Sequence, residues 1–191
     1  MNARIFVSYR SSDGTDKATA LARDLGRVFG DSAVFLDKDD LAGGSAWAQE
    51  IGRAIGGRPV LLLLMTPGLA EARGADGRRR IEASDDPVRR ELEAAFAAGA
   101  QVIPLLCDGL DAAPADLPPP FDRLAALTWR RLRAYDWRHD IDRLVADLRA
   151  LGLGPAAPDR PLTGLAPDST TPTSTPGTAT AAATPRRRAV A

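Results

Sequence analysis

Residues 85–91 read Asp-Asp-Pro-Val-Arg-Arg-Glu, and an alanine-rich run leads from them to the apolar segment Gln-Val-Ile-Pro-Leu-Leu at residues 101–106. Asp86 is a residue type that favours the N-cap of a helix, and Pro87 suits the first helical position. Three apolar side chains then recur at the spacing of one buried helical face: Leu92, Ala95 and Phe96. The stretch therefore predicts a helix that begins at Pro87, with Glu91 fixed on its second turn, followed by a buried strand.

Short apolar segments alternate with helix-like segments over most of the chain. The predicted strands are residues 4–9, 33–36, 60–65, 101–106 and a short segment within 124–132. The predicted helices are residues 16–29, a segment beginning at Ser45, the segment beginning at Pro87 and residues 140–151. Residues 10–14 and 66–85 are expected to be a turn and a loop. This alternation favours a flavodoxin-like α/β fold, with a five-stranded parallel sheet and helices on both faces.

The strand positions in such a sheet indicate where polar residues gather. Residues 60–65 are apolar throughout, which is typical of a central strand that is buried on both faces. Ligands of these sheets bind at the carboxyl ends of the strands. Four residues follow predicted strands and are expected near one rim of the sheet: Tyr9, Asp37, Pro67 and Asp108.

The chain has 191 residues, with 25 basic and 25 acidic side chains and one cysteine, Cys107. A net charge near zero gives no general attraction to nucleic acid or to anionic membranes. No apolar run reaches the roughly 18 residues that span a bilayer, and no signal-peptide pattern is present. One cysteine cannot form an internal disulfide framework, and it fits a reducing compartment. We therefore expect a cytoplasmic protein with no membrane span and no nucleic-acid partner.

Residues 154–191 differ in composition from residues 1–153. They are rich in Pro, Thr, Ala and Ser and have almost no large apolar side chains. Such a segment cannot bury enough surface to offset its ordering entropy, so we predict a disordered tail after a single folded domain. The terminal cluster in this tail is either a solubilising end or a contact for anionic partners. It consists of Arg186, Arg187 and Arg188.

Several chemistries that doubly wound sheets support lack their residues in this chain. No Gly-x-Gly-x-x-Gly follows the first strand, and no phosphate-binding Gly-x-x-x-x-Gly-Lys-Ser/Thr occurs. The single histidine, His139, argues against a Ser-His-Asp triad and against a multi-histidine metal site. The acidic loop at residues 37–40 supplies no complete set of metal ligands. Cys107 is interpreted as a buried small residue rather than a nucleophile, and we expect no metal and no bound cofactor.

Five short blocks carry a resemblance to a known family. They are Phe-Val-Ser-Tyr-Arg at 6–10, Val-Phe-Leu-Asp at 34–37 with Asp-Leu-Ala-Gly-Gly at 40–44, the segment 61–67, Asp-Pro-Val-Arg-Arg-Glu at 86–91 and Val-Ile-Pro-Leu at 102–105. Each block alone is a weak signal, whereas five blocks in the right order are specific. Over residues 4–151 the chain resembles a Toll/interleukin-1 receptor (TIR) domain of the bacterial type.

The resemblance implies two kinds of function, because many TIR domains cleave NAD⁺ and others are adaptors that only self-associate. In the enzymatic branch a glutamate on the helix after the third strand contacts the nicotinamide-side ribose, and Glu91 matches it. Pro87 stands four residues earlier, where this branch usually carries an aromatic residue. The resemblance places substrate contacts at Tyr9, Arg10, Asp37 and Trp47. It places an assembly loop at Asp39, Asp40, Leu41, Gly43 and Gly44.

The leading hypothesis is a signalling or antiphage-defence protein that hydrolyses or cyclises NAD⁺ when it self-associates. NAD⁺ is then the substrate rather than a cofactor, Glu91 is the catalytic carboxylate, and other TIR domains in a homo-oligomer are the partners. The alternative is a non-enzymatic TIR scaffold that mediates protein–protein interaction. Glu91 also fits an ordinary acidic residue near a helix N-terminus, favoured by the helix dipole and paired with a neighbouring arginine.

Overall fold

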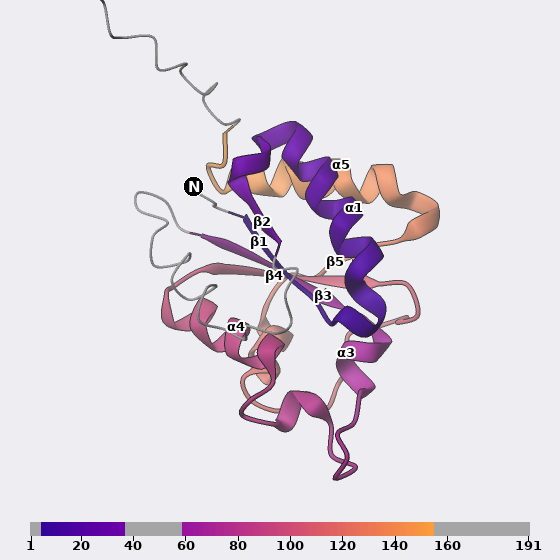
Figure 1. The fold of residues 1–191 in the computed structure, drawn as a ribbon. Helices are drawn as coiled ribbons and strands as arrows, with labels where there is room; N and C mark the ends of the chain where they lie inside the picture. Colours follow the sequence, from indigo (N-terminus) through magenta and orange to yellow (C-terminus); the bar gives the residue numbers. More distant parts are fainter. Residues whose placement is uncertain (1–4, 37–58, 155–191) are drawn as a thin grey trace, which may run out of the picture. The chain divides into compact units, whose positions relative to one another are not determined.

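The structure is a computed structural model that describes residues 5–36 and 59–154. These residues form a five-stranded parallel sheet in the order β2-β1-β3-β4-β5, which confirms the predicted flavodoxin-like fold (Figure 1). The strands are β1 Ile5–Ser8, β2 Val34–Leu36, β3 Val60–Met65, β4 Gln101–Cys107 and β5 Arg130–Leu132. The α-helices are α1 Ser11–Phe29, α3 Pro67–Glu71, α4 Pro87–Ala97 and α5 Trp137–Ala150. Short 3-10 helices cover Asp31–Ala33, Arg80–Glu82, Phe121–Ala126 and Ala134–Asp136.

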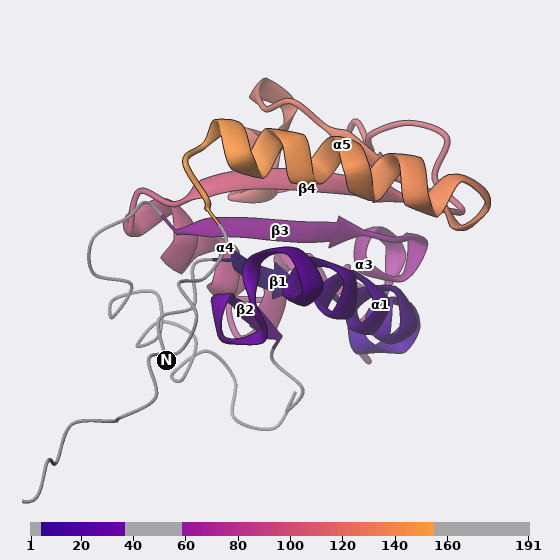
Figure 2. The ribbon, with the colours of Figure 1, turned by 90° about the horizontal axis from the view of Figure 1, so that it is seen from above.

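The strand β3 lies in the middle of the sheet, as its unbroken apolar sequence predicts. It pairs with β1 on one side and with β4 on the other, from Val60 opposite Gln101 to Met65 opposite Leu106. Figure 2 shows β3 between β4 and β1. All residues of β3 are buried, because helices cover both faces of the sheet.

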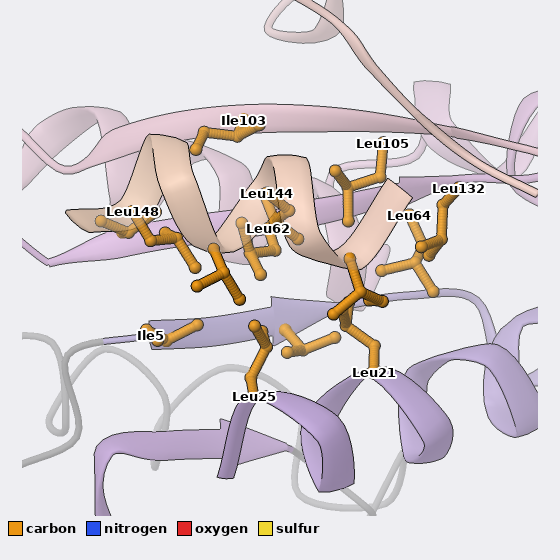
Figure 3. Close-up of a cluster of buried hydrophobic side chains, with 14 of the residues drawn as sticks. Ile5, Leu21, Leu25, Leu62, Leu64, Ile103, Leu105, Leu132, Leu144 and Leu148 are labelled. Atoms are coloured by element: carbon orange, nitrogen blue, oxygen red, sulfur yellow. The ribbon is translucent and has the colours of Figure 1, made fainter. Parts of the chain in front are cut away.

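Helices α1 and α5 cover one face of the sheet (Figure 1). Figure 3 shows how side chains of these two helices meet those of the strands in one continuous core. Its labelled members include Ile5, Leu21, Leu25, Leu62, Leu64, Leu105, Leu144 and Leu148. Burial of this many aliphatic side chains stabilises the packing of α1 and α5 against the sheet.

Helices α3 and α4 cover the opposite face of the sheet. Their core contains Phe6, Leu61, Leu63, Met65, Leu69, Val88 and Leu92. Successive residues of a strand point to opposite faces. This alternation places Ser8 and Arg10 on the α4 side of β1 with Phe6, and it places Tyr9 on the α1 side. The candidate site depends on this division.

The helix α1 begins at Ser11, although the sequence predicts a turn at residues 10–14. That prediction is wrong because the apolar stripe of α1 begins only at Ala18, while residues 11–13 are exposed. Gly14 lies inside the helix, where glycine is unfavourable. A Cβ at Gly14 would lie 3.1 Å from the Cβ of Tyr9, so close packing explains why glycine is found there.

The predicted loop at residues 66–85 contains the short helix α3. Thr66 is its N-cap, whose Oγ1 accepts a hydrogen bond from Leu69 N at 3.1 Å, and Pro67 takes the first helical position. A helix this short shows no apolar periodicity in the sequence. The helix predicted from Ser45 lies outside the described residues, as does the tail from residue 155. Within residues 5–36 and 59–154, no helix is long and apolar enough to cross a membrane.

Candidate functional site

Glu91 lies on the second turn of α4, as the sequence predicts. The N-cap of this helix is Asp86, whose Oδ1 accepts a hydrogen bond from the backbone N–H of Arg89 at 3.1 Å. Val88 and Leu92 pack into the core beneath α4 and fix the rotation of the helix. Glu91 is 7% exposed, which is an unusual environment for a carboxylate.

Asp86 also forms a buried ion pair with Arg10, which follows β1. The Nη1 of Arg10 donates to Oδ2 of Asp86 at 2.6 Å, and the two side chains are 8% and 0% exposed. The pair joins the carboxyl end of β1 to the start of the helix that carries Glu91. Sequence reasoning gave Asp86 only a capping role, because no local pattern links it to a residue 76 positions away.

Three buried polar atoms at the end of β1 have no hydrogen-bond partner in the described part of the chain. They are Ser8 Oγ, Arg10 Nε and Arg10 Nη2. Nearly all buried polar atoms in folded proteins are paired, so each exception needs an explanation. Because Ser8 and Arg10 lie on the α4 side of β1, these atoms gather near the Arg10–Asp86 pair. The structure thus brings a partly unsatisfied arginine to the helix that bears Glu91.

Tyr9 lies on the other side of β1 from this pair. It packs against the core between the sheet and helices α1 and α5, with its ring against Gly14. This packing is that of a core aromatic, and the predicted substrate contact of Tyr9 stays a prediction.

The other predicted site residues lie outside the described residues. They are the substrate-contact candidates Asp37 and Trp47 and the assembly-loop candidates Asp39, Asp40, Leu41, Gly43 and Gly44. Their roles also stay predictions.

The rim between β1 and β3, where doubly wound sheets usually bind ligands, is filled by a hydrogen-bonded junction. The carboxylate of Asp13 accepts hydrogen bonds from Thr66 Oγ1 at 2.8 Å and from Gly68 N at 2.6 Å. A Cβ on Gly68 would lie 2.5 Å from that carboxylate, so the contact leaves no space between the two helix starts. Pro67 is packed against Gly109 beside this junction. The candidate groups Glu91 and the Arg10–Asp86 pair lie instead on the α4 side of the sheet.

The arginine run at residues 78–80 does not form one basic patch. The guanidinium of Arg79 is paired with Glu82, with Nε to Oε1 at 2.8 Å. The Nε of Arg80 lies 3.8 Å from Asp86 Oδ2. Arg80 therefore places a second positive charge beside the carboxylate of Asp86, which already binds Arg10.

Cys107 is buried at the end of β4, and burial raises the pKa of its thiol to about 12. The thiol therefore stays protonated at neutral pH and is a poor nucleophile. No three His, Cys, Asp or Glu side chains are grouped so that they could hold a metal ion in the part of the chain that the structure describes.

The parallel sheet in this strand order and the nearly buried Glu91 on α4, between β3 and β4, are the features to compare with known proteins. A family model of the TIR domain matches residues 5–145, well over half of the chain, so the chain belongs to the TIR-domain family. TIR domains mediate TIR–TIR interactions, and the chain is a TIR signalling protein. A search of curated proteins found no match.

Proposed function

We propose that this TIR domain cleaves the nicotinamide–ribose bond of NAD⁺ after self-association, with Glu91 as the catalytic carboxylate. The observation that supports the proposal most is the position of Glu91. It is a nearly buried carboxylate on a helix whose start is fixed by the Arg10–Asp86 ion pair. A preorganised charge in a poorly solvated environment is what an electrostatic catalyst requires.

The chemistry fits a site with one carboxylate. In hydrolysis, the bond between C1′ of the ribose and the nicotinamide nitrogen breaks, and its electron pair leaves with neutral nicotinamide. Water adds to C1′ and releases a proton, so the products are nicotinamide, ADP-ribose and H⁺. In cyclisation, a nucleophilic atom of the ADP-ribose part itself takes the place of water and loses the proton if it carries one, so the products are nicotinamide, a cyclic ADP-ribose isomer and H⁺. The leaving group needs no acid, while the carboxylate of Glu91 stabilises the positive charge that develops on the sugar.

Self-association is part of the proposal because Glu91 is only 7% exposed in the single chain. A substrate reaches the carboxylate only after neighbouring groups move. Contacts between TIR domains supply a binding free energy that can favour the open arrangement, since a partner that binds one conformation better shifts the population toward it. Turnover is then expected to rise more steeply than linearly with protein concentration.

The test is the release of free nicotinamide from NAD⁺ by the full chain at increasing protein concentration. Glu91→Gln keeps the size of the side chain and removes its charge, and we expect it to lower turnover roughly a hundredfold or more. Glu93→Gln is the matched control, because Glu93 lies on the same helix but pairs at the surface with Arg89. Undiminished turnover in Glu91→Gln would refute the assignment of Glu91.

A specific observation favours the alternative function, a scaffold without enzymatic activity. Pro87 occupies the first position of α4, so a proline ring stands where the enzymatic branch carries an aromatic side chain. If this loss abolished activity, Pro87→Trp would be the change that restores nicotinamide release. Assemblies of the wild-type chain that release no nicotinamide would support the scaffold.

A further inference from the structure

We propose that Asp86 is a positioning residue that holds Arg10 so that one edge of its guanidinium binds a two-oxygen anion of the ligand. The inference rests on the proposed function in one respect, namely that the anion is the diphosphate of NAD⁺ or of ADP-ribose. It concerns how the ligand is bound, whereas Glu91 concerns how the bond is cleaved.

The covalent geometry of arginine defines the edge. Arg10 contacts Asp86 through Nη1. The N–H of Nε and one N–H of Nη2 point in the same direction along another edge of the planar group, and this fork matches two oxygens of a phosphate or a carboxylate. Nε and Nη2 are the two nitrogens without a partner in the described part of the chain, although Arg10 is 7% exposed.

Buried donors without partners lower the stability of the folded chain unless a ligand supplies the missing acceptors. A buried donor without a partner costs the free energy of its lost hydration, and a charged donor costs more than a neutral one. The Oγ of Ser8, two residues earlier on the same side of β1, is a third buried atom in the same condition. In this proposal, one ligand group with several oxygens accepts from Ser8 Oγ as well as from the two nitrogens of Arg10.

Asp86 is suited to orient Arg10 because the carboxylate itself is fixed at both oxygens. Its Oδ1 accepts the N–H of Arg89 at 3.1 Å, and its Oδ2 accepts Arg10 Nη1 at 2.6 Å. The side chain is fully buried, so it has no freedom to turn. Arg80 at 3.8 Å from the same Oδ2 leaves two cations on one carboxylate, which favours the approach of an anion.

Asp86→Asn separates this role from helix capping, because asparagine is as good an N-cap as aspartate but carries no charge. Asp140→Asn is the matched control, since Asp140 is also buried and also paired with an arginine, Arg133, on the other side of the sheet. The readouts are the dissociation constant of ADP-ribose by calorimetry, the KM and kcat for NAD⁺, and the unfolding midpoint of each variant.

We expect Asp86→Asn to raise the dissociation constant of ADP-ribose and the KM for NAD⁺ about tenfold to a hundredfold, the range of one hydrogen bond to a charged group. The kcat should change by less, because the helix start and Glu91 keep their place. Asp140→Asn should leave both affinities unchanged. An unchanged ADP-ribose affinity in Asp86→Asn, or a wild-type chain that does not bind ADP-ribose, overturns the inference.

Arg10→Lys keeps the proposal testable if Asp86→Asn does not fold. Lysine keeps the positive charge next to Asp86, but its single ammonium group lacks the two parallel N–H donors of a guanidinium edge. We therefore expect the same loss of ADP-ribose affinity. Unchanged affinity in this variant overturns the role of the fork. Wild-type binding of ADP-ribose that weakens in the variants, without nicotinamide release, would refute the proposed function and support the inference. Nicotinamide release with the same KM in wild type and variants would support the proposed function and refute the inference.

Discussion

Two arginine–aspartate ion pairs on opposite sides of the sheet, the buried Arg10–Asp86 pair and the partly exposed Arg133–Asp140 pair, use their arginines differently. Arg133 donates from every nitrogen of its guanidinium: Nε to Asp140 at 2.9 Å, Nη1 to Tyr135 at 3.3 Å, and Nη2 to Asp136 and Asp140 at 2.7 Å each. Arg10 uses Nη1 for Asp86, while its Nε and Nη2 have no partner in the described part of the chain. An arginine whose donors are all satisfied acts as a structural contact, whereas buried donors without a partner need an explanation, for which we have proposed a ligand anion.

The protonation behaviour of the Arg133–Asp140 pair agrees with a structural role. The hydrogen bond to Asp140 raises the pKa of Arg133. Burial opposes ionisation of Asp140, but the hydrogen bonds from Arg133 outweigh burial and leave the pKa of this carboxyl below its ordinary value. The carboxylate also accepts the backbone N–H of Arg133 at 2.9 Å. The pair therefore stabilises the connection between β5 and α5.

The largest effect on stability is expected at Asp86. Asp86→Ala leaves Arg10 buried without its counter-ion, which costs about 3–5 kcal/mol. Asp86→Asn keeps the cap, so it should unfold at a higher denaturant concentration than Asp86→Ala, by a difference of about 1 kcal/mol. Urea titration of both variants measures this difference. Equal stabilities would show that the N-cap contact at Arg89 contributes nothing.

Asp140→Asn is expected to change the acid stability of the protein. The pKa of Asp140 is lower in the folded chain than the ordinary value of about 4. The ionised carboxylate therefore contributes to the free energy of unfolding at pH values above about 4. The contribution is lost as the pH falls through the lower folded pKa. The variant should therefore be less stable at pH 7 and lose less stability between pH 5 and pH 2, as measured by urea unfolding at each pH. A parallel pH profile in wild type and variant would contradict this account of the pair.

Trp137→Phe tests the hydrogen bond between Trp137 and Asp24, which lies on the same side of the sheet as Arg133. The indole Nε1 donates to Asp24 Oδ2 at 2.8 Å and joins the first residue of α5 to α1. This hydrogen bond is the main reason that the pKa of Asp24 lies below its ordinary value. The variant should lose about 1 kcal/mol of stability at pH 7, and the pKa of Asp24 measured by NMR should rise. An unshifted Asp24 would exclude the contact.

The smallest effect on stability is expected at Ser8, which precedes Arg10 by two residues on the α4 side of β1. Since Ser8 Oγ is buried without a partner in the described part of the chain, Ser8→Ala should leave stability unchanged or raise it by up to about 1 kcal/mol. The same variant should weaken ADP-ribose binding, which is the usual relation between stability and function at a binding site. A clear loss of stability would show that the hydroxyl has a structural partner.

The sequence predicts the elements of this fold well where a local pattern defines them. The apolar run of β3 and the Asp86-Pro87 start of α4 are both recognisable from residue type. The start of α1 is not recognisable from the sequence. Gly14 suggests a turn there, but it is a glycine because the side chain of Tyr9 leaves no room for a Cβ.

The candidate site is less predictable, because it depends on contacts between distant segments. Glu91 follows from the resemblance, but the pairing of Arg10 with Asp86 appears only when β1 and α4 are folded together. Strand alternation after β1 gave one usable signal, since it separates Tyr9 from Arg10.

In the proposed arrangement Arg10 binds ligand, whereas Arg133 has a structural role. This difference is measured by following the side-chain Nε–H signals of both residues in ¹H–¹⁵N NMR spectra while ADP-ribose is added. We expect the Arg10 signal to shift with ligand concentration to a plateau and the Arg133 signal to stay in place. A stationary Arg10 signal under conditions where ADP-ribose is bound would contradict this arrangement.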